Sequence, residues 1–420
     1  MKIAVVGGGS TYTPELVDGL AMRADRVPVD EVVLLDPDVE RLAVVAGLAG
    51  RILRRRGFGG RLVATGDRAA ALDGADFIVV QLRVGGQSTR LLDETIPARF
   101  GCVGQETTGP GGFAKALRTV PVVLEVAEEA ARRAAPGAWI VDFTNPVGIV
   151  TQALLDAGHR AIGLCNVAIG FQRRFAAHFG VAPERVELEH VGLNHLSWVR
   201  AVRVDGVDRL PELLARDDAG IAADVELPLE LMRRLGAIPS YYLRYYYATP
   251  LVVAEQRGHP TRAEEVMEIE RGLLELYRDP ALDVKPALLE QRGGAFYSEA
   301  AVGLIASLHD DAGDLQVVDV LNDGALPGLP HDTVVEVPAR IHRDGAHPVA
   351  LGPLAPEMRG LVQQVKAYEE LTIEAALTGD RSVAFRALLA NPLVPDAETA
   401  AALLDAILDA DRAHLPRFAT

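Results

Sequence analysis

Two residues of a kind that can bind a metal ion each stand at the end of an apolar strand pattern. Cys165 follows "RAIGL" and His195 follows "RVELEHVGLN", and each is next to an asparagine. Alone, a cysteine or a histidine in such a place is more often part of the core. Together, a thiolate and an imidazole can hold a borderline divalent cation and leave coordination positions for substrate oxygens. We therefore predict an open metal site at these two residues.

A run of glycines between a strand pattern and a helix pattern is the second feature with chemical meaning. The stretch "KIAVVGGGSTYTPELV" places Gly7 and Gly9 in a turn and Ser10 and Thr11 at the start of a helix. Glycine permits the tight turn and lets a pyrophosphate approach the backbone N–H groups. Asp36 ends the second strand, where an acid bonds ribose hydroxyls and favours NAD over NADP, although it could also cap the next helix. The third glycine of the dinucleotide fingerprint is a tyrosine here, so the turn and Asp36 together predict the NAD site.

Other polar residues follow glycine-rich or strand-like stretches. Glu106 lies in "GQETTGPGGF", Arg90 in "RVGGQSTRLLDE", and Asn145 near the end of "AWIVDFTNP". Glycine-rich loops that carry arginine suit an anionic ligand, although most arginines lie on the surface. The stretch "SYYLRYYY" holds Tyr241 and Tyr242 among five tyrosines. Such a cluster is usually an amphipathic face, but one tyrosine beside a metal ion could act as a base.

The composition narrows the class of partner. The 420 residues carry a formal net charge of -16, so we expect a small-molecule ligand and no nucleic acid or anionic membrane. No apolar run reaches the roughly 20 residues that span a bilayer, and the two cysteines cannot form a disulfide framework. The chain begins directly with a strand pattern, so we expect no export signal and a location in the reducing cytoplasm.

Alternating apolar runs and helix patterns in the first 165 residues predict an α/β fold with a Rossmann-type, doubly wound parallel sheet. Its strands are predicted at residues 2–8, 31–36, 75–82, 138–146 and 160–166. After residue 166 we expect antiparallel strands within 185–206 and at 331–341, and helices elsewhere. The prediction is therefore an NAD-binding domain of residues 1–165 and an α/β domain of residues 166–420 for the metal, the substrate and oligomerisation, with a cleft between them.

Taken together, the motifs resemble those of the family 4 glycoside hydrolases, most closely the 6-phospho-β-glucosidase type. The resemblance runs in family order from residue 2 to about residue 270 and is only general in the C-terminal helices. The motifs that carry it are "KIAVVGGGSTYTPELVDGL", "RVGGQSTRLLDETIPARFGCVGQETTGPGGF", "DFTNP", "CNVAIGF", "GLNHLSW", "IPSYYLRYYY" and "RAEEVMEIE". The fold that this resemblance implies is similar to that of lactate and malate dehydrogenases.

The resemblance implies a hydrolysis that uses NAD and a divalent metal, usually Mn²⁺, instead of two carboxylates. In this family NAD⁺ takes a hydride from carbon 3 of the sugar, which makes the proton on carbon 2 acidic. The metal binds the oxygens of carbons 2 and 3, and a tyrosinate removes the proton. The aglycone leaves from carbon 1, water adds, and NADH returns its hydride. The implied substrate is a phosphorylated disaccharide or β-glucoside, which yields glucose 6-phosphate and an aglycone.

The resemblance also implies roles for residues of this chain. Cys165 and His195 would bind the metal, and Tyr242 would be the base, with Tyr241 as its competitor. Glu106 would raise the basicity of that tyrosine through a polar network. The residues that would hold the phosphorylated sugar are Arg90, Asn145, Asn166 and Arg262. Members of the family are dimers or tetramers, so a homodimer or homotetramer is expected.

Two positions bear on the substrate within this family. Relatives that act on 6-phospho-α-glucosides carry an acid after the cysteine, whereas Asn166 follows it here, which favours the β class and assigns no general acid. Ala168 stands where relatives commonly have proline. The alternatives are an α-linked or non-phosphorylated substrate, a malate- or lactate-type NAD dehydrogenase, and a non-catalytic NAD sensor. Net accumulation of NADH during turnover would distinguish a dehydrogenase.

Overall fold

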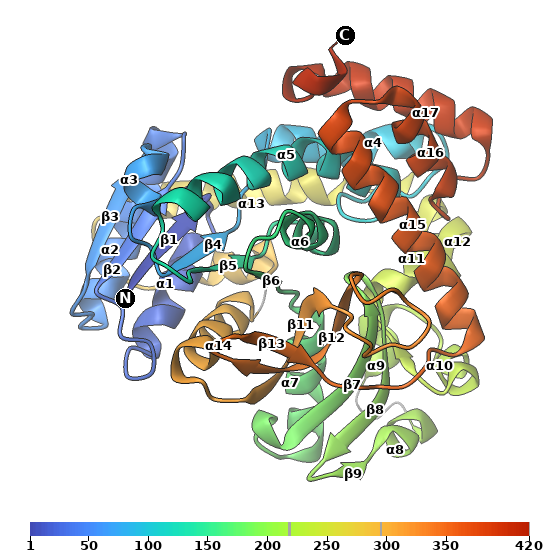
Figure 1. Ribbon diagram of the computed structural model, residues 1–420, viewed down its shortest axis with the longest axis horizontal. Helices are drawn as coiled ribbons and strands as arrows, with labels where there is room; N and C mark the ends of the chain where they lie inside the picture. Colours follow the sequence, from blue (N-terminus) through green and yellow to red (C-terminus); the bar gives the residue numbers. More distant parts are fainter. Residues whose placement is uncertain (217–219, 295, 420) are drawn as a thin grey trace.

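A mixed sheet of nine strands forms the centre of the molecule in the computed structural model, which describes residues 1–216, 220–294 and 296–419 (Figure 1). Its strands are β1 Lys2–Val6, β2 Glu31–Leu35, β3 Arg61–Thr65, β4 Phe77–Val80, β5 Trp139–Asp142, β6 Ala161–Gly163, β11 Asp314–Leu321, β12 Val334–His342 and β13 Gly345–Pro348. They lie in the order β13-β12-β11-β6-β5-β4-β1-β2-β3. The strands from β1 to β6 are parallel, and β11, β12 and β13 continue the sheet in antiparallel pairing.

A smaller antiparallel sheet lies beside this extension. Its strands are β7 Val186–Leu193, β8 Leu196–Val204, β9 Val207–Asp208 and β10 Ile238–Pro239. They pair in the order β10-β8-β7, with β9 against β8, and β7 packs on β12. At this contact Nε2 of His190 lies 2.8 Å from a carboxylate oxygen of Glu336, and both side chains are buried. The two sheets are therefore joined by a buried polar contact as well as by apolar packing.

Helices pack around the parallel strands in two groups. Their bounds are α1 Thr13–Met22, α2 Val39–Arg55, α3 Arg68–Leu72, α4 Gly86–Arg99, α5 Gly109–Arg133, α6 Val147–Asp156, α7 Val167–Phe179, α8 Leu210–Ala215, α9 Ile221–Val225, α10 Leu229–Leu235, α11 Arg244–Tyr247, α12 Thr249–Gln256, α13 Arg262–Arg278, α14 Tyr297–Asp310, α15 Pro356–Thr378, α16 Arg381–Ala390 and α17 Ala397–Ala410. Contacts link α1, α2, α13 and α14 in one group and α3, α5, α6 and α15 in the other, and α4 contacts both groups. None of the described helices is both long enough and apolar enough to cross a membrane.

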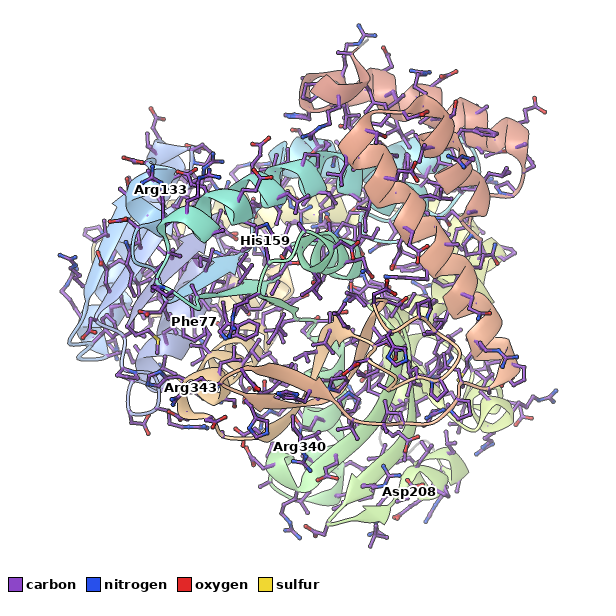
Figure 2. The ribbon with its side chains drawn as sticks, viewed as in Figure 1. Phe77, Arg133, His159, Asp208, Arg340 and Arg343 are labelled. Atoms are coloured by element: carbon purple, nitrogen blue, oxygen red, sulfur yellow. The ribbon has the colours of Figure 1, made fainter. Side chains whose placement is uncertain are left out.

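The parallel strands are apolar along most of their length. Ile3, Val5 and Val79 are fully buried, which is expected of strands covered by helices on both faces. Figure 2 shows side chains filling the space that separates the ribbons of the sheet and the helices. The core is therefore continuous from the first strand to the C-terminal helices.

The predicted fold class is confirmed, and three local features differ from the sequence-based prediction. Strand β3 is not predicted, because "RLVAT" is an edge strand whose residues are all partly or fully exposed. Strands β11 and β13 are not predicted either, because most of their residues are only partly buried and give no clear apolar run. Helix α1 begins at Thr13 and not at Ser10, because the residues from Gly7 to Thr13 form successive turns.

The chain after residue 166 also contributes to the large sheet. It supplies β11, β12 and β13, and its helices α13 and α14 pack on α2 and α1. The antiparallel strands expected within 185–206 and near 331–341 are present as β7, β8 and β12. The division into a domain of residues 1–165 and a domain of residues 166–420 stays a prediction.

A buried ion-pair group connects α4, α5 and the residue that follows α17. Arg118 donates to the two carboxylate oxygens of Asp93 at 2.9 and 2.8 Å and also contacts Asp411. All three side chains are 1% exposed. Burial raises the pKa of Asp93 to about 7, although the nearby guanidinium of Arg118 opposes this shift. The two acids therefore depend on one arginine.

We expect Arg118→Met to destabilise the fold strongly, since it leaves Asp93 and Asp411 buried without a cation. Breaking a buried pair in this way typically costs about 3–5 kcal/mol. Urea denaturation followed by circular dichroism measures the change. The matched control is Arg381→Met, which removes an exposed pair with Asp405 and is expected to cost less than about 1 kcal/mol. Equal losses in the two variants would contradict the prediction.

Candidate functional site

One large cavity lies at the carboxyl ends of the parallel strands. Its volume is about 1430 Å³, which exceeds the roughly 300–1,000 Å³ of a pocket for one drug-sized ligand. The residues of its wall that the sequence predicts are Gly7, Gly9, Ser10, Asp36, Arg90, Glu106, Asn145, Asn166, Tyr242 and Arg262. Thr11, Cys165 and His195 are buried, with 0%, 4% and 4% of their surfaces exposed.

The glycine turn after β1 is held tightly at one end of this cavity. The amides of Gly7 and Gly8 both donate to the carbonyl of Leu35, at 2.9 and 2.8 Å. The amide of Gly9 donates to the carboxylate of Asp36 at 2.9 Å. A Cβ atom on Gly9 would lie 2.8 Å from that carboxylate oxygen. The turn is therefore a cradle that only glycine fits, with its backbone at the cavity wall.

The sequence leaves two roles open for Asp36, a contact to a ribose and the N-cap of the following helix. The structure gives the second role to Asp38. The N-cap of α2 is Asp38, whose side chain accepts from the amide of Arg41 at 3.0 Å. The alternative of Asp36 as the helix cap is therefore wrong. Asp36 faces the cavity while it accepts from Gly9, which is compatible with a second contact to a ribose.

His195 and Cys165 lie beside Tyr242, which lines the cavity. His195 has a φ of 62°, and its ring stacks on that of Tyr242 with centroids 3.6 Å apart and planes 11° apart. The hydroxyl of Thr107 lies 2.9 Å from Nδ1 of His195. Cys165 is close enough to act electrostatically on Tyr242. The structure thus places each of the two predicted ligands near the predicted base.

Burial governs the protonation of the two candidate ligands. It lowers the pKa of His195 to about 4, so this imidazole is neutral at neutral pH, the form that binds metals. Burial raises the pKa of the Cys165 thiol well above its usual value, and bonds from the amide of Val167 and the side chain of Asn194 oppose this only in part. Cys165 therefore has to lose a proton when it binds a cation.

The donor chemistry of the pair fits a divalent cation in an open site. The hydroxyl of Thr107 is hydrogen-bonded to Nδ1 of His195, which leaves Nε2 for a metal ion. In metal-binding histidines the ring nitrogen that does not bind the metal is usually hydrogen-bonded in this way. No group of three or more His, Cys, Asp or Glu side chains within residues 1–216, 220–294 and 296–419 could hold a metal ion. A cation bound by Cys165 and His195 would therefore have two protein donors, and a substrate would have to supply others.

Of the two tyrosines that the sequence offers as a base, Tyr242 lies against the candidate ligands. Burial raises the pKa of Tyr242 well above its usual value, and the charges of Cys165 and Glu106 raise it further. The hydroxyl of Tyr241 instead accepts from Nη1 of Arg244 at 3.1 Å. The geometry therefore favours Tyr242 over Tyr241.

Glu106 is surrounded by cations. Its carboxylate contacts Arg83, accepts from Nζ of Lys115 at 2.7 Å and lies 3.3 Å from Nε of Arg90. Burial alone would raise the pKa of Glu106, but Arg83, Lys115 and Arg90 lower it well below the usual value. Glu106 therefore stays ionised, and it contributes a fixed negative charge to the wall near Tyr242.

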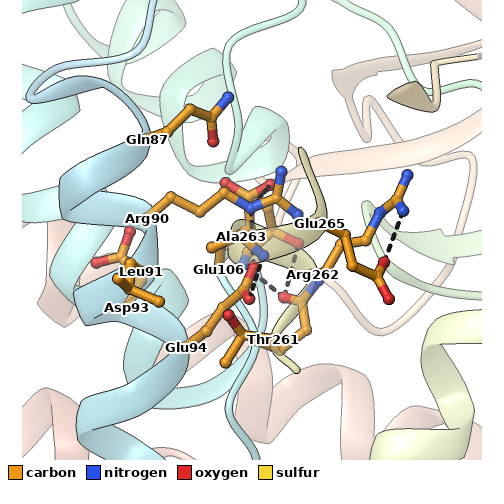
Figure 3. Close-up of polar contacts among 12 residues, drawn as sticks. Gln87, Arg90, Leu91, Asp93, Glu94, Glu106, Thr261, Arg262, Ala263 and Glu265 are labelled. Carbon is orange, nitrogen blue, oxygen red and sulfur yellow. Dashed lines mark hydrogen bonds and ion pairs between the residues drawn. The ribbon is translucent and has the colours of Figure 1, made fainter. Parts of the chain in front are cut away.

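The four residues predicted to hold a sugar phosphate all reach the cavity but differ in how they are held. Arg90 is paired with Glu94 at 2.8 Å, whereas Arg262 is half exposed and donates to Glu265 at 2.8 Å. Figure 3 shows the Arg262–Glu265 pair to one side of the group around Arg90. Asn145 has a buried side-chain oxygen without a hydrogen-bond partner among the described residues. Asn166 is the N-cap residue of α7.

Several residues of the site were not predicted from the sequence, and four of them have a clear place in it. These are Thr107, Lys115, Arg292 and Tyr297. Lys115 stands in the apolar pattern of α5 and resembles a surface lysine of an amphipathic helix. Thr107 and Tyr297 lie in or beside glycine-rich stretches, "GQETTGPGG" and "RGGAFYS", and glycine-rich composition is the one signal that points to them.

Comparisons with known proteins agree with this geometry. Residues 2–181 match the family model described as Family 4 glycosyl hydrolase, and residues 190–394 match the Family 4 glycosyl hydrolase C-terminal domain. A probable 6-phospho-beta-glucosidase of Bacillus subtilis is 42% identical over 433 residues, which cover 100% of this chain and 98% of the relative.

Solved structures show the same similarity. The 6-phospho-beta glucosidase of Thermotoga maritima with manganese, NAD+ and glucose-6-phosphate has a TM-score of 0.92 and 38% identity, with 99% of each chain covered. Malate dehydrogenase of Plasmodium falciparum has a TM-score of 0.53 and 15% identity, with 90% of this chain and 99% of that chain covered. This second likeness concerns the fold alone and confirms the predicted similarity to malate dehydrogenases.

We expect Thr107→Val to weaken the binding of Mn²⁺ by about tenfold to a hundredfold, the usual effect of losing a group that orients a metal-binding histidine. Titration of Mn²⁺, with the free ion followed by electron paramagnetic resonance, measures the affinity. The matched control is Thr108→Val, because the buried hydroxyl of Thr108 has no hydrogen-bond partner among the described residues. Equal affinities in wild type and Thr107→Val would show that the hydroxyl does not orient His195.

Proposed function

Because this chain belongs to glycosyl hydrolase family 4, we propose that it hydrolyses 6-phospho-β-glucosides to glucose 6-phosphate and an aglycone, with NAD⁺ and a divalent cation as cofactors. The observation that carries the proposal is one cavity that joins the glycine turn to the wall formed by Tyr242, against which His195 stacks. We infer that this cavity receives the nucleotide at the glycine turn and the sugar beside Tyr242. A malate-type dehydrogenase shares the fold, but its reaction requires neither a thiolate metal ligand nor a tyrosine base in this cavity.

The residues divide into groups with separate tasks. When bound, NAD⁺ supplies a hydride acceptor for carbon 3, and the cation, Mn²⁺ in our proposal, supplies a Lewis acid whose charge favours the deprotonated forms of Cys165 and Tyr242. Cys165 and His195 hold the cation. Tyr242 takes the proton of carbon 2 at its phenolic oxygen. The turn residues Gly7, Gly9, Ser10 and Thr11, together with Asp36, hold the dinucleotide.

Glu106 acts on the base through its charge. Because Arg83, Lys115 and Arg90 lower its pKa, Glu106 is ionised. Its negative charge favours the protonated form of Tyr242 and raises the pKa of that phenol. A phenol with a higher pKa gives a stronger base once it is ionised. The role predicted for Glu106 thus needs no direct bond to Tyr242.

Arg262 is the residue that we assign to the 6-phosphate. Its pair with Glu265 is half exposed on both sides, and such pairs contribute only about 0–1 kcal/mol. A phosphate that accepts two parallel bonds from a guanidinium can therefore replace Glu265. Arg90, which is paired with Glu94 and Glu106, lines the same cavity, and the unpartnered oxygen of Asn145 can accept from a sugar hydroxyl.

The β configuration is proposed on account of Asn166. This residue follows Cys165 directly and lines the cavity, but its amide cannot protonate a leaving group as a carboxylic acid can. We therefore favour a leaving group that needs no dedicated acid from this position. An α-linked or non-phosphorylated substrate remains the alternative that the assay below decides.

Three further features of the protein belong to the proposal. We place the dinucleotide mainly on residues 1–165 and the metal and substrate ligands mainly on residues 166–420. Two free cysteines, both buried, are compatible with the reducing cytoplasm as the compartment. A homodimer or homotetramer is the expected assembly, and sedimentation measures it.

Nitrophenyl 6-phospho-β-glucoside is expected to be hydrolysed only when NAD⁺ and Mn²⁺ are both present, without net accumulation of NADH. The α anomer and the dephosphorylated β-glucoside, assayed in parallel, are expected to react much more slowly. Deuterium from solvent is expected to enter carbon 2 of the product. Hydrolysis of the dephosphorylated sugar without either cofactor would overturn the proposal.

We expect Tyr242→Phe to lower kcat by about a hundredfold to ten-thousandfold, the contribution typical of a general base. The variant should still bind NAD⁺ and should no longer exchange the carbon 2 proton with solvent. Tyr241→Phe is the matched control, because Tyr241 is a neighbouring tyrosine whose hydroxyl bonds Arg244. Loss of exchange in Tyr241→Phe, with exchange retained in Tyr242→Phe, would assign the base to Tyr241.

A further inference from the structure

A buried carboxylate next to the glycine turn connects four separate parts of the chain. Glu270, on α13, is 5% exposed. It accepts from Nη2 of Arg41 on α2 at 3.0 Å and from the hydroxyl of Thr11 in the turn at 3.1 Å. It also accepts from Nε2 of Gln87 on α4 at 3.2 Å and from Nε of Arg292 at 3.3 Å. Residues far from the turn in sequence therefore define its surroundings.

Arg292 lies directly on the turn. It is the last residue of the short helix η3 (Ala287–Arg292) and is part of the cavity wall. Its Nε donates to the hydroxyl of Thr11 at 2.7 Å, and its Nη2 lies 3.5 Å from the hydroxyl of Ser10 and 3.3 Å from Glu270. Its Nη1 has no hydrogen bond or ion pair among the described residues, which leaves a charged donor for a ligand.

The segment that carries Arg292 is fixed to the turn at a second point. Tyr12 stands where the dinucleotide fingerprint has its third glycine. Its hydroxyl donates to the carbonyl of Gly294 at 2.5 Å and accepts from the amide of Ser298 at 3.3 Å. Its ring also meets that of Tyr297 edge to face, with centroids 6.3 Å apart. The tyrosine that departs from the fingerprint thus holds Arg292 in place.

Two arginines keep Glu270 ionised. Burial would raise the pKa of Glu270, but Arg292 and Arg41 lower it below its usual value, so the acid is ionised. Two guanidinium groups therefore face one carboxylate. These guanidinium groups lie beside Ser10 and beside the carbonyl of Gly9, to which Nε of Arg41 donates at 2.8 Å. The carboxylate of Asp36 accepts from the amide of Gly9, so the turn offers cationic donors for a phosphate and an acid for a ribose.

We propose that Arg292 is a further cofactor-binding residue, which donates from its free guanidinium nitrogen to the pyrophosphate of the dinucleotide, with Glu270 holding it in position. The proposal rests on the proposed function, which supplies NAD⁺ as the ligand. The sugar phosphate has the same phosphoryl chemistry and is the other possible source, because Arg262 donates to the carbonyl of Gln291 just before Arg292. The hydroxyls of Ser10 and Thr11 place Arg292 on the pyrophosphate side.

The test is the affinity for NAD⁺, measured by calorimetry on the full chain without sugar or metal. Arg292→Gln is expected to raise the Kd for NAD⁺ by about tenfold or more, the usual effect of losing a charged hydrogen bond. Arg292→Lys keeps the positive charge but lacks the forked donors of a guanidinium. Its Kd for NAD⁺ is expected to lie between those of wild type and Arg292→Gln, and this variant decides the test if Arg292→Gln does not fold. Arg278→Gln, an exposed arginine on α13 paired with Glu275, is the matched control and should bind as wild type.

A second titration with glucose 6-phosphate separates the possible sources of the phosphoryl group. The proposal requires its Kd to change less than twofold in Arg292→Gln while the Kd for NAD⁺ rises. A loss confined to glucose 6-phosphate would assign Arg292 to the sugar and overturn the proposal. An equal loss of both affinities in Arg292→Gln, together with a lower denaturation temperature, would indicate a structural role and would also overturn the proposal.

The two proposals fail in different ways. A wild-type chain that binds no NAD⁺ contradicts the proposed function, and this inference with it. A wild-type chain that binds NAD⁺, with Arg292→Gln and Arg292→Lys binding it equally well, overturns the inference alone.

Discussion

The parallel pairing of β1, β2, β4, β5 and β6 is the constraint on which the rest of this molecule depends. Strands in parallel register end at the same edge of the sheet, and ligands of open α/β folds bind outside that edge. The chain places a polar or small residue within three positions after the end of each of these strands. In chain order they are Gly7, Asp36, Gln81, Asn145 and Cys165. The parallel pairing alone therefore brings residues more than 150 positions apart in sequence to one cavity.

Buried carboxylates provide the second level of organisation. Glu106 and Glu270 are both buried and ionised, and each is surrounded by more than one cation. A buried ion without partners is very unfavourable, and breaking such a pair is strongly destabilising. Each carboxylate therefore fixes the arginines and lysines around it. One of these clusters adjoins Tyr242 and the other adjoins the glycine turn, so the charges that hold the walls together also set the electrostatic field of the cavity.

The chain after residue 166 supplies further residues in and beside the cavity wall. His195 comes from the turn between β7 and β8, and Tyr242 from the short helix η2 (Tyr241–Leu243). Arg262 begins α13, which packs on α2 and α4 of the earlier half. The chemistry proposed here needs a hydride acceptor next to a Lewis acid, and these contacts bring the two binding places into one space. Membership of glycosyl hydrolase family 4 fits an arrangement in which a dehydrogenase-like sheet carries a hydrolytic site.

The sequence by itself determined the parallel strands β1, β2, β4, β5 and β6, the glycine turn, Asp36, and the candidate pair of Cys165 and His195, whereas the family resemblance pointed to Tyr242 with Tyr241 as its competitor. These features depend on local patterns, because a buried strand must be apolar and a tight turn needs glycine. Only the tertiary structure decided that Asp38 caps α2, that Tyr242 and not Tyr241 stacks on His195, and that Lys115 and Arg292 line the cavity. Each of these facts depends on which residue, distant in sequence, contacts the side chain in the folded protein. The sequence around a charged residue looks the same whether its side chain is on the surface or in a buried ion pair.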